Sequence, residues 1–496
     1  MELPPIPPSP NNVPAIKLGR AFTKKVEPEL DLSGEVIACR VIALPESMLN
    51  VPRATVDFFS TYMEFAKASA SPKIYHKWVA LSTIASAVER KVYLDWEYTK
   101  IYPNMFIFLV GDSGAKKGTA LNVAKPLLLK AKIEKAPTMV TPEDFFKRMA
   151  EQAVRYVSEE NQDKLLVAQT PYTVIADELG VFFGGDIDKF IRALTDIYDC
   201  REVGDPWHYS TKHQGDSYME SQWLNFLAGT TPAYIKKSLP AHARDEGFLG
   251  RVINVYSEAV KITQGLPPSM LYKAGLIKED ETHSMQTHLD DKAKIEEMLV
   301  GDLIQMKKLH GAMDITAETL VAYNAWFNDH EHKVFNNTFH LSKELFGGYI
   351  SRRSTTLRKM MMLFSIARSN ALLITIEDFE QARDLLYQTE LKMPRVFNGM
   401  PRDYSHEEVL KILLHTFWAA WTEKDADVKE IVITKQTLIR NYMEAIDIEA
   451  MEKALKHLDQ GGMVIPAGIN LMGTGDFGLR LTDHGLESCK TLFSET

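Results

Sequence analysis

A loop rich in glycine and lysine follows a short apolar segment at residues 105–110. That segment is typical of a buried parallel strand, and residues 120–130 after the loop have the composition of a helix. Unpaired backbone N–H groups at a helix start attract phosphate, because the positive end of the helix dipole lies there. The order strand, loop, helix therefore predicts a phosphate-binding loop. The residues that we expect to contact a phosphorylated ligand are Gly111, Gly114, Lys116, Lys117, Gly118 and Thr119.

The loop departs at two positions from the usual phosphate-binding pattern, in which Gly-x-x-x-x-Gly-Lys is followed by Ser or Thr. Gly111 and Lys117 fit the pattern, whereas Lys116 replaces the second glycine. Gly118 replaces the Ser or Thr that would hold Mg²⁺. Either the hydroxyl of Thr119, one place later, compensates, or the metal is held through water. From this segment alone, an ordinary strand-to-helix turn stays open as the alternative.

Two adjacent acidic residues end a second apolar segment, residues 172–178. In a site that hydrolyses a nucleotide, one carboxylate fixes the Mg²⁺ shell and another polarises the attacking water. Asp177 is the expected metal ligand, together with Thr119, and Glu178 is the expected catalytic carboxylate. A solvated strand end is the alternative for this acidic pair, although its spacing from the loop suits a nucleotide-binding fold.

Polar residues also end or precede two later apolar segments. Thr230 and Thr231 follow residues 223–228, so a hydroxyl at that strand end could read a γ-phosphate. Arg251 directly precedes residues 252–256, and an arginine from a neighbouring subunit can stabilise the charge that develops on a γ-phosphate. A structural ion pair is the alternative for Arg251. A lid arginine that contacts nucleotide is expected among Arg352, Arg353 and Arg358, of which we choose Arg353.

Residues 205–218 look extended at both ends and turn-like in the middle. A hairpin at this place would project from the core. Lys212 and His213 near its tip could then follow a nucleic-acid backbone inside a ring. A plain surface hairpin is the alternative.

Composition limits the class of protein. With 496 residues, of which 45% are hydrophobic, the chain is long enough for two or more packed domains. The net charge of −9 argues against a uniformly basic nucleic-acid binder, so any contact with phosphate backbones would need a local patch. The three cysteines are widely scattered, which excludes a disulfide framework. Since no apolar stretch could span a bilayer and the first residues do not resemble a signal peptide, we expect a cytoplasmic protein without a membrane partner.

Five short motifs, taken together, resemble a family of helicase-like P-loop ATPases found in bacteriophages and mobile elements. The resemblance covers about residues 55–390, and the last three motifs are its more specific part. A helical lid followed by a winged helix is also similar to the general plan of AAA+ replication ATPases, such as the MCM proteins and the superfamily-three viral helicases. The motifs are Ile101-Tyr102-Pro103-Asn104, Lys117-Gly118-Thr119-Ala120, Ile175-Ala176-Asp177-Glu178, Ala228-Gly229-Thr230-Thr231-Pro232 and Gly247-Phe248-Leu249-Gly250-Arg251.

The resemblance implies an α/β protein with an AAA+-like core, a homo-hexameric ring, ATP with Mg²⁺, and single-stranded or forked DNA in the channel. By position, Lys117 would bind the β- and γ-phosphates, Asp177 the Mg²⁺ shell and Glu178 the water. Thr230 or Thr231 would act as the sensor and Arg251 as the finger in trans. We therefore expect a replicative DNA helicase of a bacteriophage or mobile element. Two alternatives stay open: an ATP-binding initiator or helicase loader without unwinding activity, and a DNA-packaging or transposition ATPase.

The last hundred residues read as three amphipathic helices and two short strands, the order of a winged helix. They carry ten Lys or Arg against sixteen Asp or Glu, and such a surface repels a duplex because DNA affinity comes mainly from neutralised phosphates. We expect a protein contact there, with a primase or another replication protein, or a weak DNA contact. Residues 264–287 are expected to be mobile. The predicted segments are a mobile Pro-rich leader at 1–50 with one short strand near 35–44, a helical N-terminal segment at 51–100, the P-loop ATPase core at 101–262, a helical lid at 282–396 and the winged helix at 401–496.

Overall fold

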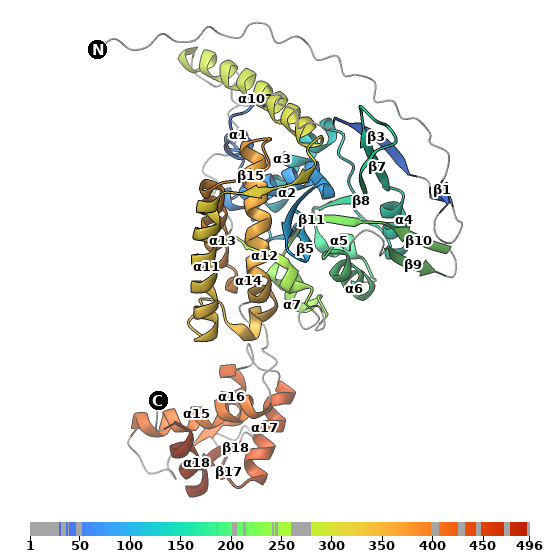
Figure 1. Ribbon diagram of the computed structural model, residues 1–496. Coiled ribbons are helices and arrows are strands. Elements are labelled where there is room, and N and C mark those ends of the chain that lie inside the picture. Colours follow the sequence, from blue (N-terminus) through green and yellow to red (C-terminus); the bar gives the residue numbers. More distant parts are fainter. Residues whose placement is uncertain are drawn as a thin grey trace. The chain divides into compact units, whose positions relative to one another are not determined.

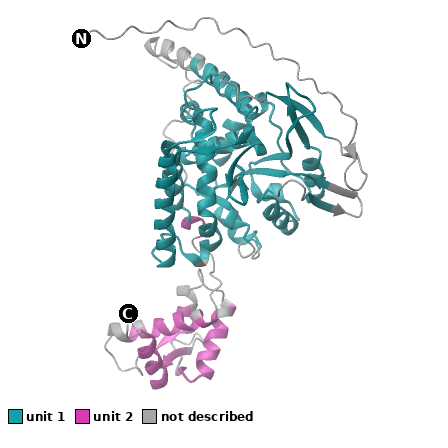
Figure 2. Ribbon diagram, in the orientation of Figure 1, with its two compact units in different colours: residues 1–393 teal, residues 394–496 magenta. Residues whose placement is uncertain are grey.

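The chain divides into two compact units, Met1–Met393 and Pro394–Thr496 (Figure 2). Most of the expected leader and part of the expected mobile segment, residues 264–278, lie outside the described residues. The short strand expected near the end of the leader is confirmed, since β3 (Arg40–Leu44) pairs with another strand of the central sheet. The computed structural model describes residues 29–30, 36–37, 39–45, 52–185, 187–200, 206–211, 215–240, 243, 247–258, 279–397, 406–424, 432–442, 448–470 and 477–493.

A six-stranded mixed sheet lies at the centre of the first unit and confirms the mixed α/β class (Figure 1). Four strands, β12, β6, β11 and β8, are parallel, whereas β7 runs antiparallel to β8 and β3 runs parallel to β7. Every residue of β6 and β11 is buried, as expected for inner strands covered on both faces. In sheet order the strands are β12 (Val252–Tyr256), β6 (Phe106–Val110), β11 (Gln222–Thr230), β8 (Leu165–Ala176), β7 (Val154–Ser158) and β3 (Arg40–Leu44).

Helices cover both faces of this sheet. Successive side chains of a strand point to opposite faces, and two neighbours on β11 show what lies on each side. The amide of Asn225 donates to Ser82 and Ser86 of one helix, α2. The ring of Phe226 instead contacts Phe182 in another helix, α5. The helices on the Asn225 side are α2 (Lys73–Val88) and α3 (Lys117–Lys130), and those on the Phe226 side are α5 (Leu179–Phe183) and α6 (Ile187–Ile197).

The predicted hairpin at residues 205–218 is present as the antiparallel pair β9 (Trp207–Thr211) and β10 (Gly215–Met219). The Trp207 ring packs against Phe146 of α4 (Pro142–Ala150), which anchors the base of the hairpin. Lys212 and His213 lie outside the described residues.

The expectation of an all-helical segment at residues 51–100 is wrong at its end. Helices α1 (Phe58–Phe65) and α2 are present, but β4 (Val92–Trp96) pairs antiparallel with β5 (Thr99–Ile101). Val92, Tyr93 and Trp96 of β4 are β-branched or aromatic residues, which favour a strand, and Glu97 takes a positive φ of 53° at the turn. Short elements of the first unit are β1 (Glu29–Leu30), β2 (Val36–Ile37), η1 (Glu89–Lys91), α7 (Pro232–Lys237), η2 (Leu249–Arg251), β13 (Gly311–Ala312), β14 (Asp314–Ile315) and β15 (Leu373–Ile374).

Residues 282–396 are mostly helical, as the sequence predicts. Residues 279–287 were expected to be mobile, but they form the start of α10. Met360, Met361 and Met362 of α12 are buried in the core. Figure 1 shows α11, α12 and α13 packed side by side. The helices of this region are α10 (Glu279–Met306), α11 (Ala317–Phe335), α12 (Lys343–Arg368) and α13 (Ile376–Glu390).

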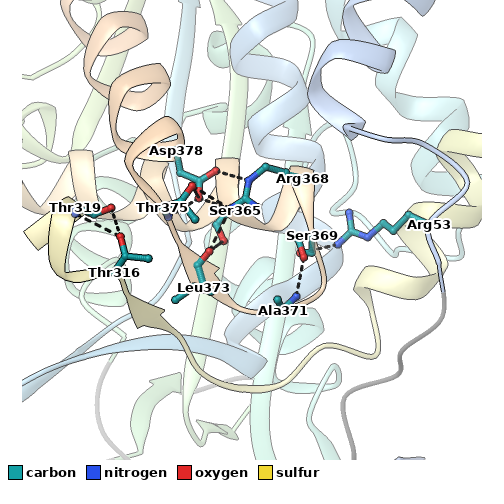
Figure 3. A network of polar contacts seen from close by, with 10 residues as sticks. All are labelled: Arg53, Thr316, Thr319, Ser365, Arg368, Ser369, Ala371, Leu373, Thr375 and Asp378. Atoms are coloured by element: carbon teal, nitrogen blue, oxygen red, sulfur yellow. Dashed lines mark hydrogen bonds and ion pairs between the residues drawn. The ribbon is translucent and has the colours of Figure 1, made fainter. Parts of the chain in front are cut away.

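A polar network fixes the turn between α12 and α13 (Figure 3). Thr375 and Asp378 form a capping box at the start of α13. Arg368 donates to Asp378 at 2.8 Å, and Ser365 donates to Leu373 O at 2.8 Å. Arg53, far away in sequence, donates to Ser369 O at 3.4 Å. The network therefore ties the end of α12 to the segment just before α1.

The second unit has its own core and a small antiparallel sheet of strand order β16-β18-β17. Its three predicted helices are confirmed. A short strand, β16, and a last helix, α18, were not predicted. Cys489 of α18 is buried in this core. The elements are α14 (Pro394–Phe397), α15 (His406–Lys424), β16 (Ile433–Thr434), α16 (Lys435–Tyr442), α17 (Ile448–Gln460), β17 (Val464–Asn470), β18 (Phe477–Leu481) and α18 (Asp483–Phe493).

Candidate functional site

The glycine-lysine loop joins β6 to α3 at the carboxyl end of the parallel strands. The Tyr75 hydroxyl donates to Val110 O at 2.7 Å, just before the loop. The Gly111 N–H donates to Thr230 O at 3.3 Å. A Cβ at position 111 would lie 2.5 Å from Tyr75 Oη and 2.7 Å from Ser257 O, closer than atoms can approach. Glycine is therefore required where the chain leaves β6.

The loop backbone turns through two left-handed residues before α3 starts. Gly114 has φ 91°, and Lys116 has φ 59° directly before Lys117, the first residue of α3. A left-handed conformation costs a non-glycine residue about 1–2 kcal/mol, which explains why glycine is the usual residue at position 116. Lys116 makes no side-chain cap among the described residues, so the first N–H groups of α3 stay open to a ligand.

Lys117 is folded back over the loop. Its ammonium donates to Gly111 O at 2.6 Å and to Asp112 O at 3.1 Å, and only 8% of the residue is exposed. Burial lowers the pKa of Lys117, and the nearby carboxylates of Glu178 and Asp112 partly offset this effect. A cation held between loop carbonyls at a helix start is placed to bind anionic oxygen atoms.

The acidic pair lies next to this loop although one strand, β11, separates β8 from β6. Gly229 of β11 makes this approach possible, because a Cβ there would lie 2.5 Å from Asp177 O and 3.5 Å from Lys117 Cβ. A Cβ at position 118 would lie 4.0 Å from Asp177 Oδ1. The structure therefore brings Lys117, Gly118, Asp177 and Glu178 together, as the sequence predicts.

Lys125, which the sequence analysis did not single out, forms an ion pair with Asp177. The ammonium of Lys125, from the third turn of α3, lies 2.6 Å from both Asp177 Oδ1 and Asp177 Oδ2. It also lies 3.0 Å from Asn122 Oδ1. Gly118, Asn122 and Lys125 are spaced i, i+4, i+7, so they share one face of the helix. This spacing was the signal in the sequence that could have indicated Lys125.

These residues do not fit a Mg²⁺ ion held by the protein. Mg²⁺ requires oxygen ligands in near-octahedral geometry at about 2.0–2.1 Å. Both oxygen atoms of Asp177 are paired with Lys125, and Gly118 supplies no oxygen. Thr119 lies half-buried in the first turn of α3. Across the described residues, no group of three or more His, Cys, Asp or Glu side chains lies together, so these residues offer no site for a metal held by such side chains alone.

The two threonines at the end of β11 differ in their environment. Thr230 is fully buried in register with Val110, and its hydroxyl has no hydrogen-bond partner within the described part of the chain. Thr231 caps α7, because its side chain accepts the N–H of Tyr234 at 3.2 Å. The Thr230 hydroxyl is therefore enclosed and without a partner among the described residues, whereas Thr231 has a structural role.

Arg251 lies at the amino end of the parallel strands, opposite the loop, which lies at their carboxyl end. Its neighbour Val252 pairs with Phe106, the first residue of β6, whereas the loop follows the last residue of that strand. The five residues of β6 separate the two ends of the strand by roughly 16 Å. Arg251 pairs with Asp199 at 2.5 Å and donates to Gly247 O at 3.1 Å. It cannot reach the loop of its own chain. Within this chain Arg251 belongs to a structural ion pair, the alternative named above, and the role in trans stays a prediction.

The expected lid arginine, Arg353, is wrong for a nucleotide contact. It is 4% exposed and donates to the buried carboxylate of Glu390 at 2.6 and 2.9 Å. Its guanidinium also lies over the rings of Trp326 and Phe339. Of the two other arginines, Arg358 is buried against the Trp96 ring. Arg352 is half-buried and donates a hydrogen bond to Gly348 O.

A scan of the sequence against models of protein families gives no match, and a search of curated proteins gives none either. Within the described residues, no helix combines the length and the apolar character needed to cross a membrane.

Proposed function

We propose that the protein binds and hydrolyses ATP at the Gly111–Thr119 loop and uses this reaction as a ring-forming motor on DNA, as a replicative helicase of a bacteriophage or mobile element does. The observation that carries the proposal is the position of the loop. From β6 the chain first builds strands on one side, β8 and β11, and later adds β12 on the other side. Ligands of open α/β sheets bind at such a switch point, outside the carboxyl ends of the strands.

The surrounding side chains suit phosphoryl chemistry. Lys117 would exchange the carbonyl of Gly111 for oxygen atoms of the β- and γ-phosphates, and the open N–H groups of α3 would bind the same anion. Glu178 is exposed and close enough to Lys117 to affect its pKa, so it is available to orient a water molecule. In this proposal the hydroxyl of Thr230, which has no hydrogen-bond partner among the described residues, would sense the terminal phosphate.

Two observations support a ring that acts on DNA. Arg251 lies beyond reach of its own loop, which suits an arginine that completes the site of a neighbouring subunit. The β9–β10 hairpin is inserted between the acidic strand and β11, where its predicted tip residues Lys212 and His213 would follow a DNA backbone. In this proposal the second unit is an acidic winged helix whose exposed Glu449 and Glu452 suit a protein contact, such as one with a primase.

The test is ATP turnover by the full chain with and without single-stranded DNA. We expect DNA to stimulate turnover, and Lys117→Ala or Glu178→Gln to reduce it by at least about a hundredfold, the scale typical of catalytic groups. Lys130→Ala is the matched control, because Lys130 lies on the same helix but pairs with Glu296 at the surface. Unchanged turnover in both site variants would refute the proposed ATPase.

A second candidate, an ATP-binding initiator or helicase loader, is supported by the altered loop and by the acidic second unit. Both candidates bind ATP, but only the helicase unwinds. Strand displacement on a forked duplex by the purified protein separates them: displaced strand supports the helicase, and ATP binding without displacement supports the loader.

A further inference from the structure

The ammonium of Lys125 lies beside the loop at the carboxylate that was expected to hold the metal. We propose that the nucleotide site works without a protein-held divalent cation, and that Lys125, fixed by Asp177 and Asn122, supplies the positive charge beside a metal-free nucleoside triphosphate. This inference rests on the proposed nucleotide site and names the form of nucleotide that this site accepts.

The geometry shows that Lys125 is built into the site. Both Asp177 oxygen atoms lie 2.6 Å from the Lys125 ammonium, and Asn122 Oδ1 lies 3.0 Å away. Lys125 is only 21% exposed, whereas an unconstrained surface lysine would extend into water. A lysine has three N–H donors. Replacing the Asn122 amide by a phosphate oxygen would keep all three donors satisfied while Asp177 holds the ammonium in place.

Position 118 leaves room for this arrangement. Its missing side chain would point at Asp177, with a Cβ 4.0 Å from Oδ1. The Asp177 carboxylate therefore lies between the Lys125 ammonium and the start of α3, where phosphate is expected. A serine at this position would place a hydroxyl, and with it a metal ligand, at the same carboxylate.

The charges of the loop agree with a metal-free ligand. A nucleoside triphosphate without Mg²⁺ brings several negative charges that the site has to balance. The usual loop contributes a single lysine. Here Lys116 and Lys117 lie at the start of α3 and Lys125 lies on its side, so the chain itself supplies two further cations. For Mg²⁺ to bind Asp177, it would first have to displace an ammonium that makes two charge-assisted contacts.

Equilibrium binding tests the inference on the full chain, with fluorescent N-methylanthraniloyl-ATP as the probe, in excess EDTA and in excess MgCl₂. For the unmodified protein we expect dissociation constants that agree within about threefold between the two conditions. A protein that binds the probe more than about tenfold more weakly in EDTA would overturn the inference while leaving the nucleotide site intact. No binding in either condition by folded protein would refute the nucleotide site, and the inference with it.

Two variants and one control locate the effect. Lys125→Met removes the charge and keeps the length of the side chain, so metal-free affinity should fall roughly tenfold to a hundredfold, the range for one lost charge-assisted contact. Combining it with Gly118→Ser should make binding depend on Mg²⁺, because the freed Asp177 then has a hydroxyl beside it. Lys130→Met, on the same helix, should bind as the unmodified protein does. Equal metal-free affinities of Lys125→Met and the unmodified protein would contradict the role of Lys125, provided that both unfold at the same temperature.

Discussion

Replacing Arg353 by alanine should destabilise the first unit strongly and leave the nucleotide site unaffected. Glu390 is completely buried, and Arg353 supplies two of its hydrogen bonds, at 2.6 and 2.9 Å. After the substitution the carboxylate keeps only the Tyr349 hydroxyl at 2.9 Å and His340 Nε2 at 3.1 Å among its described partners. Removing one partner of a buried ion pair costs about 3–5 kcal/mol, because the other charge stays buried.

Urea unfolding followed by tryptophan fluorescence measures this loss, and the dissociation constant for nucleotide is measured on the same preparation. Lys333→Ala is the matched control, since Lys333 forms an exposed pair with Asp329 on α11 and such pairs contribute about 0–1 kcal/mol. Arg353→Met combined with Glu390→Leu should recover much of the stability, because a packed apolar pair needs no charge compensation. An Arg353→Ala protein with unchanged stability but lost nucleotide affinity would refute the reasoning and restore the lid arginine.

The same pair makes the first unit sensitive to acid. Burial alone would raise the pKa of Glu390, but hydrogen bonds from His340 and Arg353 outweigh it and hold the pKa below its usual value. Because the folded pKa is depressed, this contribution to stability is present above the pKa of the unfolded chain and is lost as the pH falls through the folded pKa. Urea midpoints measured from pH 6 to pH 3 should therefore fall more steeply in the unmodified protein than in Arg353→Met/Glu390→Leu.

Two further predictions concern buried positions near the core. His76 is buried with no partner for either ring nitrogen among the described residues, and burial lowers its pKa to about 4. Since the unfolded chain binds the proton more tightly, stability should be lost as the pH falls from about 6.5 towards 4, and His76→Phe should remove this loss in thermal unfolding at pH 5 compared with pH 8. Gly111→Ala should abolish nucleotide binding, because the new Cβ would lie 2.5 Å from Tyr75 Oη, whereas Gly114→Ala meets no atom within 4 Å among the described residues and should show only the cost of a positive φ. Equal binding by the two glycine variants would contradict this account of the loop.

Local patterns predicted the elements around the loop well. The apolar run before Gly111 and the acidic pair after β8 both depend on residues close in sequence, and both are present. The β4–β5 pair was missed because a few alternating residues directly after the long α2 helix give a weak strand signal. In the second unit, β16 has only two residues and offers no period to detect.

The errors in the candidate site have a different cause. Whether an arginine is buried depends on partners that local patterns do not reveal: Arg353 pairs with a residue one helix further along the chain, Glu390. Likewise, Lys125 pairs with Asp177 only because α3 passes close to the carboxyl end of β8 in the fold. The distance of Arg251 from the loop follows from the strand register, which the order of motifs does not contain. Residue types and order therefore identified the neighbourhood of the site, but not which charges in it are already paired.

The two departures of the loop from the usual pattern are physically linked. Glycine is usual at position 116 because the backbone turns left-handed there, and Lys116 makes that turn with φ 59° at a cost of about 1–2 kcal/mol. The glycine is found instead at position 118, where the turn does not need it and where a side chain would point at Asp177. Together the two exchanges add a cation at the helix start and keep a metal-binding hydroxyl away from a carboxylate that Lys125 already holds. It follows that Gly118→Ser alone should not create a magnesium site: as long as Lys125 is present, the new hydroxyl would meet a paired carboxylate.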